Sequence, residues 1–145
     1  MERKINDTMM LVHFYSRHTK MFDPYCAAQM VLMELCVPPN CEGHDYLLHA
    51  IVERYHNSAR TFHEGIYSIV GNYYATGLSV GQMETAMRYV INKAWNQREE
   101  DIWACFFPCC NGGRVKKPSN TEFISEIARF LWLWERCCQE VSCCE

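Results

Sequence analysis

The sequence predicts an all-α protein with a single compact domain of six or seven helices. Apolar side chains recur at helical spacing in almost every segment, and no segment alternates apolar and polar residues as a half-buried strand does. Pro and Gly clusters separate the periodic segments from one another. At 145 residues, with 49% hydrophobic and 21% charged residues, the chain is most simply one globular domain.

The first half of the chain contains four predicted helices. They are expected over residues 7–19, 23–36, 43–57 and 61–75. The start of the second helix is well specified, because Asp23 can cap it and Pro24 fits the first helical position. Its end is predicted at Pro38 and Pro39, which prevent the helix from continuing.

The second half contains three more predicted helices, one of which has clear signals at its start. They are expected within residues 76–100, over residues 98–107 and over residues 121–140. The predicted domain organisation is an N-terminal extension with a possible extra helix, a helical domain and a Cys-rich tail, over residues 1–22, 23–140 and 141–145.

The stretch "TGLSVGQMETAMRYVINKAWNQREE" carries the clearest helix start in the chain. Ser79 and Gln82 have the spacing of a capping box, and Leu78 and Met83 that of a hydrophobic staple. One side of this helix is expected to be core, and gathers Met83, Met87, Val90, Ile91, Ala94 and Trp95. The opposite side is short and polar, with Gly81, Thr85, Arg88, Tyr89 and Asn92.

A helix, a turn containing Gly77 and a second helix form the layout of a helix-turn-helix. In that motif the second helix enters the major groove and its N-terminal residues meet base edges. Arg88 suits guanine, Gln82 and Asn92 suit adenine, and Thr85 suits a thymine methyl group. The alternative is that this layout only connects two helices of a bundle.

Three segments in order resemble the C-terminal effector domain of the stage-zero sporulation protein A family. They are "CVPPNCEGHDYLLHAI", "METAMRYVINKAW" and "KPSNTEFISEIARFL", at residues 36–51, 83–95 and 117–131. The resemblance covers roughly residues 24–135. It implies an all-helical domain that binds promoter DNA through a helix-turn-helix and regulates transcription in endospore-forming bacteria. It also implies tandem copies on DNA and contact with the polymerase sigma subunit.

The chain departs from that family in two respects. The family carries a phosphoreceiver domain upstream, and the segment before Pro24 is too short for one. The family's recognition helix has basic residues where this chain has Gln82 and Thr85, and a histidine where it has Tyr89. Glu84 and Arg88 match. Because fewer cations weaken the salt-sensitive part of DNA affinity, either the DNA site has changed or binding has been lost.

The expected partner is double-stranded promoter DNA. The residues expected to contact bases are Gln82, Thr85, Arg88, Tyr89 and Asn92. Those expected to contact phosphates are Ser79, Lys93, Arg114, Lys116 and Lys117. The net charge of −3 offers no general attraction to nucleic acid, so any contact must come from a local patch. That charge favours a second hypothesis, an interaction module that pairs with a full-length regulator or with RNA polymerase without binding DNA.

Ten cysteines are unusual for a chain of this length, and without an export signal free thiols are expected. Two groups lie in the second half, at Cys105, Cys109 and Cys110 and at Cys137, Cys138, Cys143 and Cys144. Four of these thiolates would form a zinc site if the final helix returned beside the loop, which gives a third hypothesis, a zinc- or thiol-responsive regulator. The spacing is not CxxC, so reduced, partly buried thiols are favoured and no metal or other cofactor is expected.

No enzyme motif is present: the sequence lacks HExxH, a nucleophile elbow, a P-loop and a recognisable pair of carboxylates. "REED", at residues 98–101, reads as a solvated helix start. No apolar run is long enough to cross a membrane, and no signal peptide is evident, so a cytoplasmic protein without catalytic residues is expected.

The final helix is apolar nearly all round in "FLWLW", at residues 130–134. Two interpretations stay open. A central helix surrounded by neighbours would be apolar on every side. A homodimer surface would also place aromatic residues outward, because aromatic residues are favoured anchors at interfaces.

Overall fold

The computed structural model describes residues 2–18, 21–74, 77–110 and 112–143. These residues form seven α-helices, one π-helical turn and no strand, which confirms the predicted all-α fold. The helices are α1 (Glu2–His18), α2 (Pro24–Glu34), α3 (Glu42–His56), α4 (Tyr67–Tyr74), α5 (Val80–Asn96), α6 (Glu100–Phe106) and α7 (Asn120–Cys143). The π-helical turn η1 (Phe62–Ile66) runs directly into α4.

Two predicted helices differ markedly from the structure. The N-terminal helix starts at Glu2, earlier than the predicted residue 7. The helix predicted over residues 61–75 is divided, because its first turn is π-helical and only Tyr67–Tyr74 is α-helical. The N-cap of α2 is confirmed, since Asp23 Oδ1 accepts the backbone N–H of Tyr25 at 2.9 Å.

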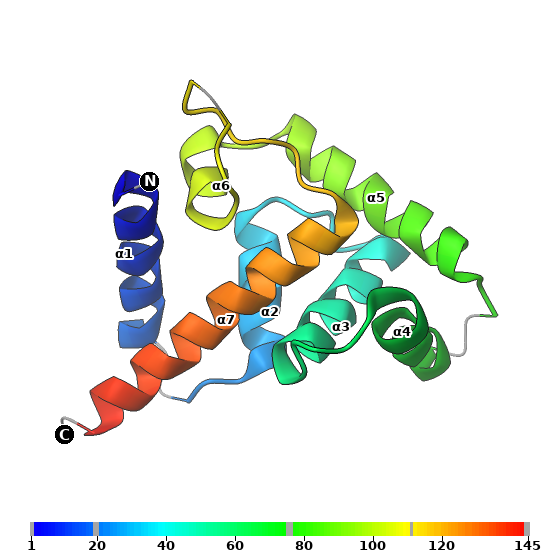
Figure 1. Ribbon diagram of the computed structural model, residues 1–145, viewed down its shortest axis with the longest axis horizontal. Coiled ribbons are helices and arrows are strands. Elements are labelled where there is room, and N and C mark those ends of the chain that lie inside the picture. The colour runs from blue at the N-terminus through cyan, green and yellow to red at the C-terminus, as the bar shows by residue number, and fades with distance from the viewer. Residues whose placement is uncertain (1, 19–20, 75–76, 111, 144–145) are drawn as a thin grey trace.

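The long helix α7 is the centre of the fold. It packs against α1, α2, α3, α5 and α6, and Figure 1 shows it crossing the molecule diagonally between them. Phe130, Leu131 and Trp134 are buried in these contacts, which explains why the helix is apolar on several sides. Trp132 is the exception, because it is 48% exposed and lies beside the guanidinium of Arg136.

The first helix is packed firmly on the C-terminal half of α7. The ring of Tyr15 stacks on Trp134 with centroids 4.8 Å apart, and Val12 is fully buried. Thr8 Oγ1 donates a hydrogen bond to the Cys105 carbonyl of α6 at 2.6 Å. In the described residues α1 is therefore part of the same hydrophobic core, although the predicted boundary at residue 22 stays a prediction.

Two contacts fix α3 against its neighbours. Gly43 lies so close to α5 that a Cβ atom on it would be 2.7 Å from the Ala86 carbonyl carbon and would overlap the carbonyl oxygen. At the other end, the Tyr55 hydroxyl donates a hydrogen bond to the Glu135 carboxylate of α7. None of the described helices is long and apolar enough to span a bilayer.

Candidate nucleic-acid interface

The predicted helix-turn-helix is formed by α4, the turn around Gly77 and α5 (Figure 1). Gly77 has φ +66°, a conformation that glycine adopts without steric cost. The capping box is confirmed: Ser79 Oγ accepts the Gln82 N–H at 3.2 Å, and Gln82 Oε1 accepts the Ser79 N–H at 2.9 Å. The direction in which α5 leaves the turn is therefore fixed by both side chains.

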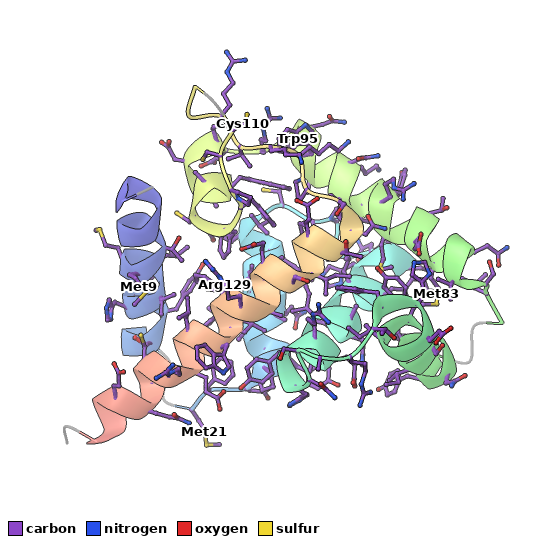
Figure 2. The ribbon with its side chains drawn as sticks, viewed as in Figure 1. Met9, Met21, Met83, Trp95, Cys110 and Arg129 are labelled. Atoms are coloured by element: carbon purple, nitrogen blue, oxygen red, sulfur yellow. The ribbon has the colours of Figure 1, made fainter. Side chains whose placement is uncertain are left out.

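The division of α5 into an inner and an outer face is confirmed. Met83, Met87 and Ala94 are buried, and Figure 2 shows Met83 between α5 and α4. A Cβ atom on Gly71 of α4 would lie 3.4 Å from the Met83 Sδ. Thr85 and Arg88 are exposed on the opposite face. The helix thus presents a polar surface on an anchored scaffold.

The residues predicted to contact bases differ in how many of their polar atoms already have a partner within the protein. Arg88 is exposed and forms no ion pair with any residue that the structure describes. Thr85 Oγ1 donates to the Gly81 carbonyl at 2.9 Å, which leaves its methyl group and lone pairs outward. Gln82 is exposed, but its Oε1 atom belongs to the capping box. A bidentate contact from Gln82 to adenine would require that the box open.

Tyr89 and Lys93 form a pair on the outer face of α5. The Lys93 ammonium lies 4.9 Å from the centre of the Tyr89 ring, and Tyr89 is 52% exposed. Hydrogen bonding to Tyr89 raises the pKa of Lys93, which keeps the ammonium charged. The pair therefore presents a cation together with an aromatic face.

Asn92 is less exposed than the sequence predicts. It lines a shallow groove of about 280 Å³ between α5 and the start of α7, and its Oδ1 is buried with no hydrogen-bond partner among the described atoms. The groove is lined by Arg88, Ile91, Asn92, Lys117, Pro118, Ser119, Asn120 and Glu122. The fold thus brings Arg88 and Asn92 of the predicted base-contacting set next to Lys117 of the predicted phosphate-contacting set.

The loop between α6 and α7 carries Arg114, Lys116 and Lys117, all exposed. It folds back on itself through a bridge between Cys109 and Val115, in which the Cys110 N–H donates to the Arg114 carbonyl at 2.7 Å. Figure 2 shows Cys110 on this loop. Arg114 is therefore held on a hairpin-like turn, Lys116 and Lys117 follow it toward α7, and Lys117 lies beside α5 in the groove.

Glu100 anchors this loop, a role that no sequence pattern indicates. Its Oε1 accepts the Val115 N–H at 2.6 Å, and its Oε2 accepts Arg98 Nε at 2.9 Å. The bond from Val115 is the main cause that lowers the pKa of Glu100. Residues 98–101 do start a helix with acids in its first turn, as predicted, and Glu100 in addition reaches the loop. A contact across 15 residues leaves no local pattern to detect.

Two further contacts position α5 from its other neighbours. Asn120 Nδ2 donates to the Glu84 carbonyl at 2.9 Å, which joins the start of α7 to α5. His63 Nε2 lies 3.3 Å from Glu84 Oε1, which joins η1 to α5. Sequence patterns predicted neither, because the partners are far apart along the chain.

The two groups of cysteines are not brought together. Cys109 and Cys110 lie in the loop after α6, whereas Cys137 and Cys138 lie near the C-terminal end of α7 (Figure 1). The side chains of Cys143 and Cys144 lie outside the described residues. Within the described part of the chain no cluster of three or more His, Cys, Asp or Glu side chains is arranged to hold a metal ion. The return of the final helix beside the loop, on which the zinc hypothesis depended, does not occur.

An all-helical domain in which a turn leads into a capped second helix, with an arginine on its outer face, has the layout of a helix-turn-helix. A family model described as "Sporulation initiation factor Spo0A C terminal" matches residues 28–131, and the chain belongs to this family of DNA-binding regulator domains. The matched region includes α3, α4, α5 and α6 and ends within α7. A search of curated proteins found no match.

Proposed function

We propose that the protein is a sequence-specific DNA-binding transcription regulator of the sporulation-effector type. The observation that carries the proposal is Arg88, an exposed arginine with no ion pair in the described residues, on the outer face of a capped recognition helix. Lys117 lies in the same groove. An unpaired guanidinium next to a second cation suits a guanine base beside a backbone phosphate.

The remaining contacts are assigned by position. Base edges would be read by Thr85, Arg88, Tyr89 and Asn92, with Gln82 joining if the capping box opens. Phosphates would be held by Lys93, Arg114, Lys116 and Lys117, and by the backbone at Ser79. Because the Ser79 hydroxyl already accepts the Gln82 N–H, the exposed start of α5 is the better donor there. A cytoplasmic location and contact with the polymerase sigma subunit fit this role.

Selection of bound sequences from a random duplex pool is the test, followed by fluorescence anisotropy on the selected site. Arg88→Ala is expected to weaken specific binding by about 1–3 kcal/mol and to relax the preference at one base pair. Arg129→Ala is the matched control, because Arg129 is an exposed arginine of α7 that lies away from α5 (Figure 2). Unchanged specific binding by Arg88→Ala would contradict the proposed mechanism.

A second candidate function is an interaction module that pairs with a full-length regulator or with RNA polymerase and does not bind DNA. The net charge of −3 and the exposed Trp132 on α7 favour this candidate. A homodimer through the same helix is the simplest version of it. Capture of the partner in nuclease-treated extract, lost with Trp132→Ala, would support it, whereas monomeric behaviour without a partner would count against it.

A further inference from the structure

Arg88 is left unpaired although a carboxylate stands one turn before it. Glu84 and Arg88 have the i, i+4 spacing, with the acid on the N-terminal side, which is the favourable order for an ion pair on a helix. The structure shows no ion pair between them in the described residues. Instead Glu84 Oε1 lies 3.3 Å from His63 Nε2. Glu84 therefore interacts with a residue outside its own helix.

The π-helical turn η1 places His63 in this position. The Ile66 N–H donates to the Thr61 carbonyl at 2.9 Å, five residues earlier, so the turn is wider than an α-helical one. The His63 side chain remains 68% exposed while its Nε2 meets the Glu84 carboxylate, which is 25% exposed. π-helical turns occur frequently at functional sites, and this one faces the recognition helix.

Tyr67 contacts His63 and lies close enough to Glu84 to feel its charge. Its ring contacts the His63 ring with centroids 5.7 Å apart in an edge-on arrangement. Its hydroxyl is buried and has no hydrogen-bond partner among the described atoms. Burial and the nearby Glu84 carboxylate raise the pKa of Tyr67 to about 12, so the phenol stays neutral next to Glu84 and Arg88.

The other charged groups around η1 have partners elsewhere or are exposed. On the α3 side, the Arg54 guanidinium lies 4.5 Å from the Phe62 ring centre, and Arg60 pairs with Glu53 at 3.4 Å. Within η1, Glu64 is exposed. From α5, Glu84 faces His63 directly, and Arg88 lies one turn further along. Among the described residues Glu84 is the one charged group within ion-pair distance of His63.

We propose that His63 is a positioning residue for Arg88, which makes DNA binding tighter as the pH falls. This proposal rests on the proposed function. Protonated His63 holds the Glu84 carboxylate and cancels its charge, so Arg88 stays available to the duplex. Histidine side chains in general change charge between about pH 5 and 8. Loss of the proton from His63 releases Glu84. The released carboxylate then pairs with Arg88 and repels phosphate.

The experiment measures DNA affinity by anisotropy at fixed salt from pH 5.5 to 8, using the duplex selected above. The wild-type protein is expected to bind about two- to fivefold more tightly at the acid end, a range set by the modest strength of exposed ion pairs. His63→Gln is expected to bind equally weakly at both ends. His56→Gln is the matched control, because His56 is an exposed histidine at the end of α3 and should leave the profile unchanged.

A double-mutant cycle with Glu84→Gln separates this role from a general structural one. In the Glu84→Gln background, replacing His63 should no longer alter affinity at pH 5.5, because no carboxylate remains to be held. Equal effects of His63→Gln in both backgrounds, or an unchanged pH profile in His63→Gln, would overturn the proposal while leaving DNA binding intact. Absence of wild-type binding at every pH would overturn the proposed function and this inference with it. Circular dichroism confirms that each variant is folded.

Discussion

At the scale of single residues, Cys36 ends α2 in a conformation that suits glycine better. Its φ is +63°, and it is the one non-glycine residue with positive φ in the described part of the chain. The Cys36 N–H donates to the Met33 carbonyl and the Val37 N–H to the Leu32 carbonyl, which is a Schellman motif. The helix therefore ends at Glu34, several residues before Pro38 and Pro39, where the sequence predicted its end.

Cys36→Gly is expected to raise the free energy of unfolding by about 0.5–1 kcal/mol, because glycine adopts the left-handed region without steric cost. Urea denaturation followed by circular dichroism measures the change. Gln29→Gly, in the exposed middle of the same helix, is the control and should lower the free energy of unfolding by about 1 kcal/mol. A loss of stability in Cys36→Gly would show that the thiol contributes more than the strain removes.

Gly43 shows the opposite case, in which a glycine is required by a neighbour. The space for a Cβ atom is occupied by the backbone of Ala86, and a backbone carbonyl cannot turn aside as a side chain can. Gly43→Ala is expected to lower the free energy of unfolding by about 1–3 kcal/mol, the usual cost of overpacking. The measurement is again urea denaturation.

Gly81→Ala is the control for that prediction. Its Cβ would meet only Ser79 Oγ, at 3.9 Å, so the substitution should be neutral or stabilising by up to about 1 kcal/mol. A Gly43→Ala variant as stable as the wild-type protein would contradict the close approach of α3 and α5.

At the scale of elements, the loop between α6 and α7 depends on a carboxylate at the start of α6. Glu100 holds the Val115 N–H, and Val115 is buried between Arg114 and Lys116. This hydrogen bond, together with those from the Cys110 N–H to the Arg114 carbonyl and from the Lys116 N–H to the Pro108 carbonyl, positions two predicted phosphate contacts. A basic loop anchored in this way loses less conformational entropy on binding than a free one.

Glu100→Gln is expected to change how stability depends on pH. Because the folded protein lowers the pKa of Glu100 from its ordinary value of 4.5, the ionised carboxylate stabilises the fold. This contribution is complete above the ordinary pKa and is lost as the pH falls through the lower folded value. Wild-type protein should lose it in that acid range, whereas Glu100→Gln should lack that step.

At pH 7 the same variant should be less stable by about 0.5–1 kcal/mol, the net value of a partly exposed hydrogen bond. Thermal unfolding between pH 3 and 7 measures both effects. Glu99→Gln is the control, because Glu99 is exposed and makes no side-chain bond to the helix it precedes. A pH dependence in Glu100→Gln equal to that of the wild-type protein would remove Glu100 from this role.

At the scale of the whole molecule, a net charge of −3 coexists with five exposed cations on α5 and on the loop between α6 and α7. We define the α5–loop surface as the cations Arg88, Lys93, Arg114, Lys116 and Lys117. Overall charge offers no attraction to DNA, so binding must depend on these five groups and on the counterions that they displace.

If all five meet phosphates or the adjacent bases, the logarithm of the binding constant should fall with the logarithm of salt concentration with a slope near −4.5. Lys117→Ala should reduce the magnitude of that slope by about 1. Arg129→Ala, outside the α5–loop surface, should leave it unchanged. Anisotropy titrations between 50 and 200 mM salt, a range of about fourfold, provide the measurement. A slope near zero would favour the interaction module instead.

The family match covers residues 28–131, and the structure adds packing beyond both ends of it. Tyr15 of α1 stacks on Trp134 of α7, and neither residue lies in the matched region. The matched domain is thus extended by a contact between its two flanking segments.

The sequence by itself determined the helices and the two faces of α5, because both depend on residues within a few positions of one another. Ser79 and Gln82 formed the predicted box, and the apolar residues of the helix turned inward as their spacing required. Local sequence could not decide whether the apolar helix α7 is surrounded by other helices or forms a homodimer surface. Its burial depends on five other helices, and no local pattern tells whether an apolar helix is surrounded or exposed.

Only the tertiary structure decided which polar groups meet. Glu84 lies beside His63 rather than Arg88, Glu100 holds Val115, and Asn92 is turned into a groove. Each of these outcomes joins segments that are distant along the chain, and a hydrogen bond or an ion pair depends on distances of a few tenths of an ångström that packing alone sets. Residue types and periodicity determine which face of each helix is apolar and which is polar. The packing of the core determines which polar groups contact one another.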